Sequence, residues 1–142
     1  IEFIDELLSH LGKSLNVTED KMDIVTAISG SGPAFFYKTI HEIALAGEKL
    51  GLDYEKSLLL AAQTAIGSAK IMLTSDLTPE ELIDNIATKG GCTEVGVSVM
   101  NDENTEKLFE EIISTTVFAR ESEADTSVPF TVPSTLFSFE IF

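Results

Sequence analysis

The pattern of apolar and polar positions along the chain is helical over most of its length. Apolar residues recur every three or four positions, which places them on one face of a helix. The predicted helices cover residues 1–12, 33–50, 54–73, 79–88, 94–100 and 103–123. A brief strand is predicted over Ser14–Val17. The fold class that follows is all-α, with a strand or tail at each end.

Residues suited to helix ends mark several of these boundaries. Pro33 fits the first turn of its helix, where its missing N–H costs nothing. Thr78, Pro79 and Glu81 form the pattern of a capping box, in which Thr78 caps the helix and Glu81 reaches back to the amide of the cap. For the next helix, the pattern alone favours Thr93 as a capping residue over Thr93 as a ligand-binding group.

The predicted helix over residues 54–73 is apolar around most of its circumference. A helix of this kind must be buried, and a small domain offers few places to bury it. We therefore expect a partner subunit to cover part of it. A membrane span is not expected, because polar side chains interrupt the apolar stretch. These side chains are Gln63, Thr64, Ser68 and Lys70.

The composition is that of one globular domain. The 142 residues are 44% hydrophobic and 23% charged, which is too apolar for a disordered chain. Nine basic and 24 acidic residues give a formal net charge of −15, and this argues against nucleic-acid binding because phosphates would be repelled. No secretory segment opens the chain, so a cytoplasmic or organelle-matrix location is expected, and cytoplasmic is the prediction.

Residue types that often carry chemistry are few in this chain. The single cysteine, Cys92, excludes a disulfide within the chain and is expected to be a small packed residue. His10 and His41 lack the spacing of metal ligands, so no metal site is predicted. His41 is interpreted as a packed or surface histidine and not as a base. The acidic run from Asp102 to Glu111 is interpreted as a solvated helix face.

Two glycine-rich segments precede predicted helices. The spacing in Ser29–Pro33 is not that of a dinucleotide-binding loop, and tight packing between helices is the favoured interpretation. In Thr88–Thr93, two glycines before a threonine leave several backbone N–H groups directed at one spot, which suits a carboxylate. Lys89 either adds positive charge to such an anion site or points into solvent.

Several motifs, in their order and spacing, resemble those of a known family. They are Asp23–Phe35, Ala46–Leu52, Ala61–Thr64, Gly67–Lys70 and Leu82–Thr93. Over residues 20–124 the chain resembles the C-terminal domain of pyrroline-5-carboxylate reductase.

The resemblance implies a two-domain enzyme of proline biosynthesis that reduces 1-pyrroline-5-carboxylate to proline with NAD(P)H. Residues 1–20 would be the end of an N-terminal Rossmann domain and a linker, and residues 125–142 a tail. Residues 21–124 would be the helical dimerisation and substrate-binding domain. Its fold would be similar to the C-terminal-like fold of 6-phosphogluconate dehydrogenase, and it would form an intertwined homodimer. Assembly beyond the dimer stays open.

The cofactor of such an enzyme would be NADP or NAD, bound in the full-length protein. The glycine-rich cofactor loop of the family is absent from this chain, so the cofactor-binding residues are unknown here. No cofactor is expected to bind tightly to this chain, and the chain alone is expected to be inactive.

The resemblance also assigns a substrate site to the second glycine-rich segment. The substrate-binding residues would be Thr88, Lys89, Gly90, Gly91, Cys92 and Thr93. The N–H groups of the turn would hold the carboxylate of a small imino acid. Thr93 would be the catalytic residue, with its hydroxyl hydrogen-bonded to the ring nitrogen. A role for Thr93 in capping would not exclude this one.

One position departs from the pattern of the family. Lys89 stands where the family usually has proline, and this change frees one backbone N–H, relaxes the turn and adds a cation. A reductase of a related cyclic imino acid is therefore one alternative. Another is a stand-alone, non-catalytic helical dimerisation module that kept the fold and lost the chemistry.

Overall fold

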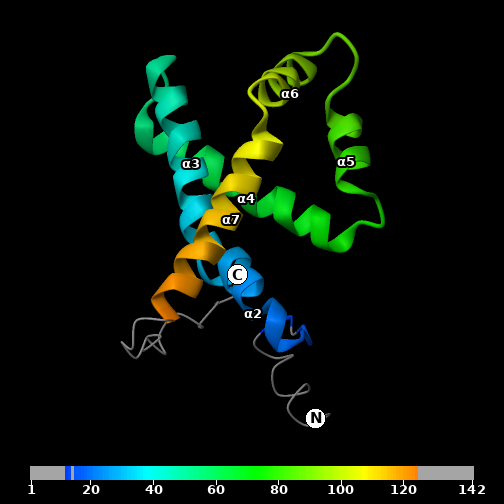
Figure 1. Cartoon of the computed structure of the whole chain (residues 1–142). Helices are drawn as coiled ribbons and strands as arrows, with labels where there is room; N and C mark the ends of the chain where they lie inside the picture. The colour runs from blue at the N-terminus through cyan, green and yellow to red at the C-terminus, as the bar shows by residue number, and fades with distance from the viewer. Residues whose placement is uncertain (1–11, 14, 125–142) are drawn as a thin grey trace.

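The computed structural model describes residues 12–13 and 15–124, and all regular structure in this part of the chain is helical (Figure 1). The elements in chain order are η1 (Glu19–Lys21), α2 (Met22–Val25), η2 (Thr26–Gly30), α3 (Gly32–Lys49), α4 (Tyr54–Thr74), α5 (Pro79–Ile86), α6 (Cys92–Asp102) and α7 (Thr105–Ala124). Element η1 is a 3₁₀ turn, and η2 is a π-helical turn that continues α2. The predicted all-α fold is confirmed.

Helices α3, α4, α5 and α7 lie where the apolar periodicity predicted them, with ends that differ by only a few residues. The prediction of a strand over Ser14–Val17 is wrong for its described residues, 15–17, which form no strand. A strand needs a neighbour to pair with, and the described chain offers none. The predicted helix over residues 1–12 lies outside the described residues except for Gly12.

The start of α6 also differs from the prediction. The helix begins at Cys92, and Gly91 is its N-cap residue with an extended backbone (φ −84°, ψ 161°). Thr93 therefore lies inside the first turn, where its side chain cannot occupy the capping position. The favoured interpretation of Thr93 as a cap is wrong, and its hydroxyl is left available for another partner.

Helix α5 begins with the predicted capping box. The Thr78 N–H donates to Glu81 Oε2 at 2.8 Å, and the Glu81 N–H donates to Thr78 Oγ1 at 3.2 Å. Pro79 occupies the first helical position. A helix of only eight residues depends strongly on how its ends are satisfied.

We expect Thr78→Ala to destabilise α5 by about 1 kcal/mol, because the Glu81 N–H loses its acceptor. Amide hydrogen exchange over residues 79–86 should accelerate accordingly. Thr78→Ser keeps the hydroxyl and should exchange at the rate of the original protein. Equal acceleration in both variants would contradict the capping role.

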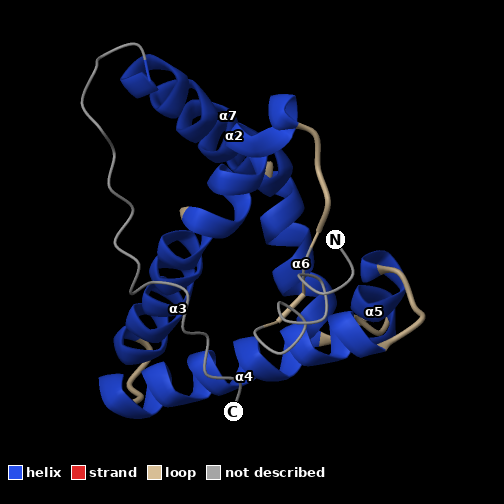
Figure 2. Ribbon diagram, turned by 90° about the horizontal axis from the view of Figure 1, so that it is seen from below, coloured by secondary structure: helices blue, strands red, loops and turns tan. Residues whose placement is uncertain are grey.

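Helices α3 and α4 form a hairpin whose arms diverge from a tight turn (Figure 2). Gly51, with φ +100°, adopts the left-handed conformation of this turn. A Cβ on Gly47 would come within 2.6 Å of Ser57 Oγ, so the two helices approach closely only because Gly47 has no side chain. His41 Nδ1 lies 2.9 Å from the Tyr54 hydroxyl across the same hairpin. His41 is thus a surface histidine that links two helices.

An ion pair joins the first and last helices of the described body. Asp23 of α2 contacts Arg120 of α7, although 97 positions separate the two residues in the sequence. Both side chains are about 41% exposed. Arg120 is the only arginine of the chain. The pair holds α7 against α2, which lies close to it in Figure 1.

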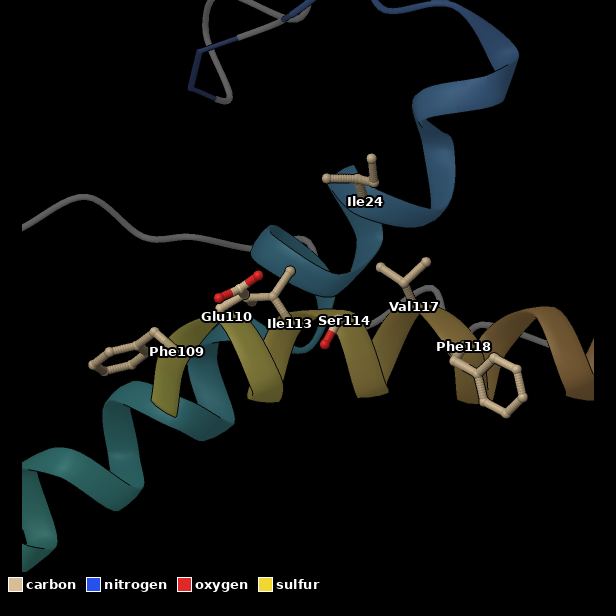
Figure 3. Close-up of a pocket in the computed structure, with 7 residues that line it drawn as sticks. All are labelled: Ile24, Phe109, Glu110, Ile113, Ser114, Val117 and Phe118. Carbon is tan, nitrogen blue, oxygen red and sulfur yellow. The ribbon is translucent and has the colours of Figure 1, made fainter. Parts of the chain in front are cut away.

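A shallow apolar groove lies between α2 and α7 (Figure 3). Ile24 of α2 lines this groove together with Phe109, Ile113 and Val117 of α7, which recur every four residues and so share one face. Ile24 and Phe109 remain 40% and 44% exposed. The described chain thus leaves this apolar groove open.

The described part of the chain has almost no hydrophobic core. Its buried apolar residues are three alanines, Ala27, Ala44 and Ala61. Among the described helices, α4 alone is long and apolar enough to cross a membrane by length and composition, and only 11% of its most apolar window is buried. The core helix of a water-soluble protein passes the same test when a neighbour covers it, so this finding does not distinguish the two.

Helix α4 has two opposite faces made of small or apolar residues. Ser57 and Ala61 lie on the face that meets α3. Leu59, Ile66 and Leu73 recur every seven residues, and at about 100° per residue they fall on the opposite face. These three side chains are 68%, 60% and 81% exposed. We call them the bare face of α4, because no described segment covers them.

Candidate functional site

The turn between α5 and α6 holds every residue that the sequence assigned to a substrate site. We call residues 88–93 the α5–α6 turn. Only Gly91 and Thr93 are half-buried in it, and the other four residues are exposed. In Figure 1 the turn lies at the opposite end of the body from α2. The predicted residues therefore come together, at a place open to solvent or to a second molecule.

Both glycines are required by the geometry of the α5–α6 turn. Gly90 has φ +79°, a left-handed conformation that other residues rarely adopt. The Gly91 N–H donates to the Thr88 carbonyl oxygen at 2.8 Å and closes the turn. A Cβ on Gly91 would come within 2.9 Å of both this oxygen and the Thr88 hydroxyl. A side chain at Gly91 would therefore force the turn open.

The N-terminus of α6 presents free hydrogen-bond donors. The amides of Cys92 and Thr93 find no acceptor in the described backbone, and Gly91 has no side chain with which to cap the helix. Amides at the positive end of a helix dipole favour an anion. The half-buried Thr93 side chain belongs to the same helical turn. The arrangement can hold a carboxylate beside a hydroxyl group.

A glutamate that the sequence analysis did not single out takes part in the turn. Glu94 Oε2 accepts a hydrogen bond from the Gly90 N–H at 2.6 Å. Glu94 is the third residue of α6, so its carboxylate folds back over the helix N-terminus as the acidic half of a capping box does. An acidic residue in the first turn after a glycine pair was the available signal.

The two remaining polar residues of the turn are both exposed. Lys89 forms no ion pair with the described residues. Cys92 is a free, exposed cysteine, so the expectation of a packed residue is wrong for the described chain. Its position at the start of α6 explains this, because the first turn projects away from the other helices (Figure 1). Within the described ranges, no group of three or more His, Cys, Asp or Glu residues is placed to hold a metal ion.

The first glycine-rich segment, Ser29–Pro33, is not part of this site. It ends the π-helical turn η2 and begins α3. Gly32 is buried, and a Cβ on Gly30 would lie 3.2 Å from Thr26 Cγ2. Nothing lies within 4 Å of a Cβ placed on Gly32, and Thr26 belongs to the same helical turn as Gly30, so the favoured interpretation of tight packing between helices is not shown at either glycine. The described segment before it is helical and not a strand, so the unit that binds a dinucleotide is not formed here.

A family model described as pyrroline-5-carboxylate reductase dimerisation matches residues 19–123. The pyrroline-5-carboxylate reductase of Staphylococcus saprophyticus is 36% identical over 114 residues, which cover 80% of this chain and 42% of that protein. The corresponding protein of Staphylococcus haemolyticus is 34% identical over 116 residues, 82% of this chain and 43% of its own length. This chain therefore spans less than half the length of these relatives.

Solved structures share the helical fold. The pyrroline carboxylate reductase of Plasmodium falciparum, determined with NADP bound, has a TM-score of 0.77 and 32% identity, covering 89% of this chain and 50% of that one. A pyrroline-5-carboxylate reductase from Coxiella burnetii has a TM-score of 0.81 and 27% identity, covering 85% of this chain and 45% of its own. In each case, the similarity takes in half or less of the solved chain.

Proposed function

Because this chain belongs to the pyrroline-5-carboxylate reductase dimerisation family, we propose that it is the dimerisation and substrate-binding part of an enzyme that reduces 1-pyrroline-5-carboxylate to proline with NAD(P)H. The observation that carries the proposal is the family match over residues 19–123. The free amides at the start of α6 support it on chemical grounds, since the substrate carries a carboxylate.

In the proposed site, the amides of Cys92 and Thr93 bind the substrate carboxylate. Hydrogen bonds from amides to an ionised group are stronger than those between neutral partners, so two of them suffice to orient a small ring. The Thr93 hydroxyl bonds the ring nitrogen and fixes which face of the imine is presented. Thr88, Gly90 and Gly91 serve by giving the turn its shape.

The exposed side chain of Lys89 favours a second substrate class. It adds an exposed cation beside the α5–α6 turn, and as a non-proline residue it leaves the backbone freer than proline would. A related cyclic imino acid is therefore the alternative substrate. Turnover of pyrroline-5-carboxylate against its six-membered-ring homologue by the full-length protein separates the two.

The cofactor belongs to a part of the protein outside the described residues. These residues contain no strand–helix–strand unit, so no cofactor contact is assigned to them. We propose that residues 1–20 end an N-terminal Rossmann domain that binds NADP or NAD. Residues 21–124 then form the helical domain, and residues 125–142 a tail. A cytoplasmic location and the lack of a nucleic-acid partner belong to the same proposal.

A homodimer is the proposed assembly. The bare face of α4 and the groove between α2 and α7 are apolar surfaces that the described chain leaves open. Burial of such surface is the main favourable term in subunit association. We propose that a second copy covers α4, and not lipid, because Gln63 and Lys70, which lie away from α3, would be unsatisfied in a bilayer.

We expect Thr93→Ala in the full-length protein to lower kcat/KM for pyrroline-5-carboxylate about 10- to 100-fold, because one hydrogen bond to the reacting ring is lost. Steady-state oxidation of NADPH measures this change. Thr93→Ser keeps the hydroxyl and serves as the control, with an expected change of less than about fivefold.

Unchanged activity in Thr93→Ala would mean that the role assigned to Thr93 is wrong. A full-length protein that reduces neither pyrroline-5-carboxylate nor a related cyclic imino acid would contradict the proposed enzyme. It would instead favour the non-catalytic dimerisation module.

A further inference from the structure

We infer that Glu94 is a positioning residue of the α5–α6 turn: its carboxylate holds the Gly90 amide and so determines which amides remain for a substrate. The inference rests on the proposed function, because that function brings a substrate carboxylate to this turn. Glu94 lies directly after residues 88–93, to which the sequence analysis assigned the substrate site.

The hydrogen bonds of the turn divide the amides of residues 90–93 into two pairs. The Gly90 N–H donates to Glu94 Oε2 at 2.6 Å, and the Gly91 N–H donates to the Thr88 carbonyl oxygen at 2.8 Å. Both are therefore satisfied by the chain itself. The consecutive amides of Cys92 and Thr93 have no acceptor in the described backbone. A ligand carboxylate can therefore accept hydrogen bonds from the amides of Cys92 and Thr93, but not from those of Gly90 and Gly91.

The bond to Glu94 also stabilises an unusual backbone conformation. Gly90 has φ +79° and is exposed, and nothing lies within 4 Å of where its Cβ would be. Two hydrogen bonds order this exposed turn: the charge-assisted bond from the Gly90 N–H to Glu94, and the bond from the Gly91 N–H to the Thr88 carbonyl. Without the bond to Glu94, Gly90 would explore other conformations, and the two free amides would lose their common direction.

The negative charge of Glu94 has a second effect, which opposes the first. It lies at the same helix N-terminus that a substrate carboxylate would approach, and two like charges in one turn repel. Ordering by the hydrogen bond favours binding, whereas the charge disfavours it. A glutamine at this position keeps a carbonyl acceptor for the Gly90 N–H and removes the charge, so the two effects can be separated.

The test compares Glu94→Ala with Glu94→Gln in the full-length enzyme, using pyrroline-5-carboxylate and NADPH. We expect Glu94→Ala to raise KM about tenfold or more while kcat changes less than about threefold, since the lost bond orders the binding site. Glu94→Gln should have a KM no higher than that of the original enzyme. Glu106→Gln, which removes the same charge from the first turn of α7, is the matched control and should leave KM unchanged.

Thermal unfolding of each variant accompanies the kinetics, and Glu94→Gln carries the test if Glu94→Ala fails to fold. A purely structural role would lower the melting temperature and kcat of Glu94→Ala together, whereas the positioning role raises its KM with both nearly unchanged. The inference is overturned if Glu94→Ala leaves KM unchanged, or if Glu94→Gln raises KM as much as Glu94→Ala does. An original enzyme without activity on pyrroline-5-carboxylate would overturn the proposed function, and the inference with it.

Discussion

Ile66→Glu is expected to convert the proposed dimer into monomers and to destabilise the fold at the same time. Ile66 is the middle residue of the bare face of α4, between Leu59 and Leu73. Placing a carboxylate in an apolar interface removes a buried side chain and adds an unpaired charge, at a cost of about 3–5 kcal/mol. A symmetric dimer contains this change twice, so association should weaken by more than about a thousandfold.

Light scattering coupled to size exclusion measures the mass, and circular dichroism measures helix content in the same samples. Lys56→Gln is the matched control, because it lowers the net charge of α4 by the same single unit at an exposed polar position. We expect this variant to remain dimeric. A dimer of unchanged affinity in Ile66→Glu would mean that the bare face of α4 is not part of the interface.

Gly91→Ala is expected to reduce kcat/KM of the full-length enzyme at least about a hundredfold, the loss typical of a site displaced by about 1 Å. Its methyl group would lie 2.9 Å from the Thr88 carbonyl oxygen. The hydroxyl of Thr88 can rotate away, but the carbonyl belongs to the backbone and is held by the Gly91 N–H. The turn must open, and the free amides of α6 then point elsewhere.

Gly96→Ala is the control on the same helix. Nothing lies within 4 Å of a Cβ placed on Gly96, and alanine favours the helix, so activity should stay within about threefold of the original. Because the α5–α6 turn is exposed, Gly91→Ala should change the melting temperature only slightly. Full activity in Gly91→Ala would exclude this turn as the substrate site.

The helices were predictable because their signals are local. Apolar residues at helical spacing located α3 and α4, and the pair Thr78 and Glu81 located the start of α5 to the residue. The start of α6 was not predictable in the same way. Any threonine near a helix start resembles a cap, and only the extended backbone of Gly91 decides which residue takes that position.

The sequence predicted which residues form the candidate site, but not which hydrogen bonds they form. Two glycines followed by a threonine indicate free amides, and the structure gathers these residues in one turn. Which amides are free depends on the rotamer of Glu94 and on the carbonyl of Thr88, and neither follows from spacing. The contact between Asp23 and Arg120 was equally inaccessible, because no local pattern relates residues 97 positions apart.

That contact has a consequence for how other parts of a longer protein would be attached. Since α2 and the final turns of α7 lie side by side, the chain enters and leaves the helical body at one point. Segments joined to either end would therefore attach next to one another on the helical body. This attachment point lies at α2 and α7, whereas the α5–α6 turn lies at the opposite end of the body (Figure 1).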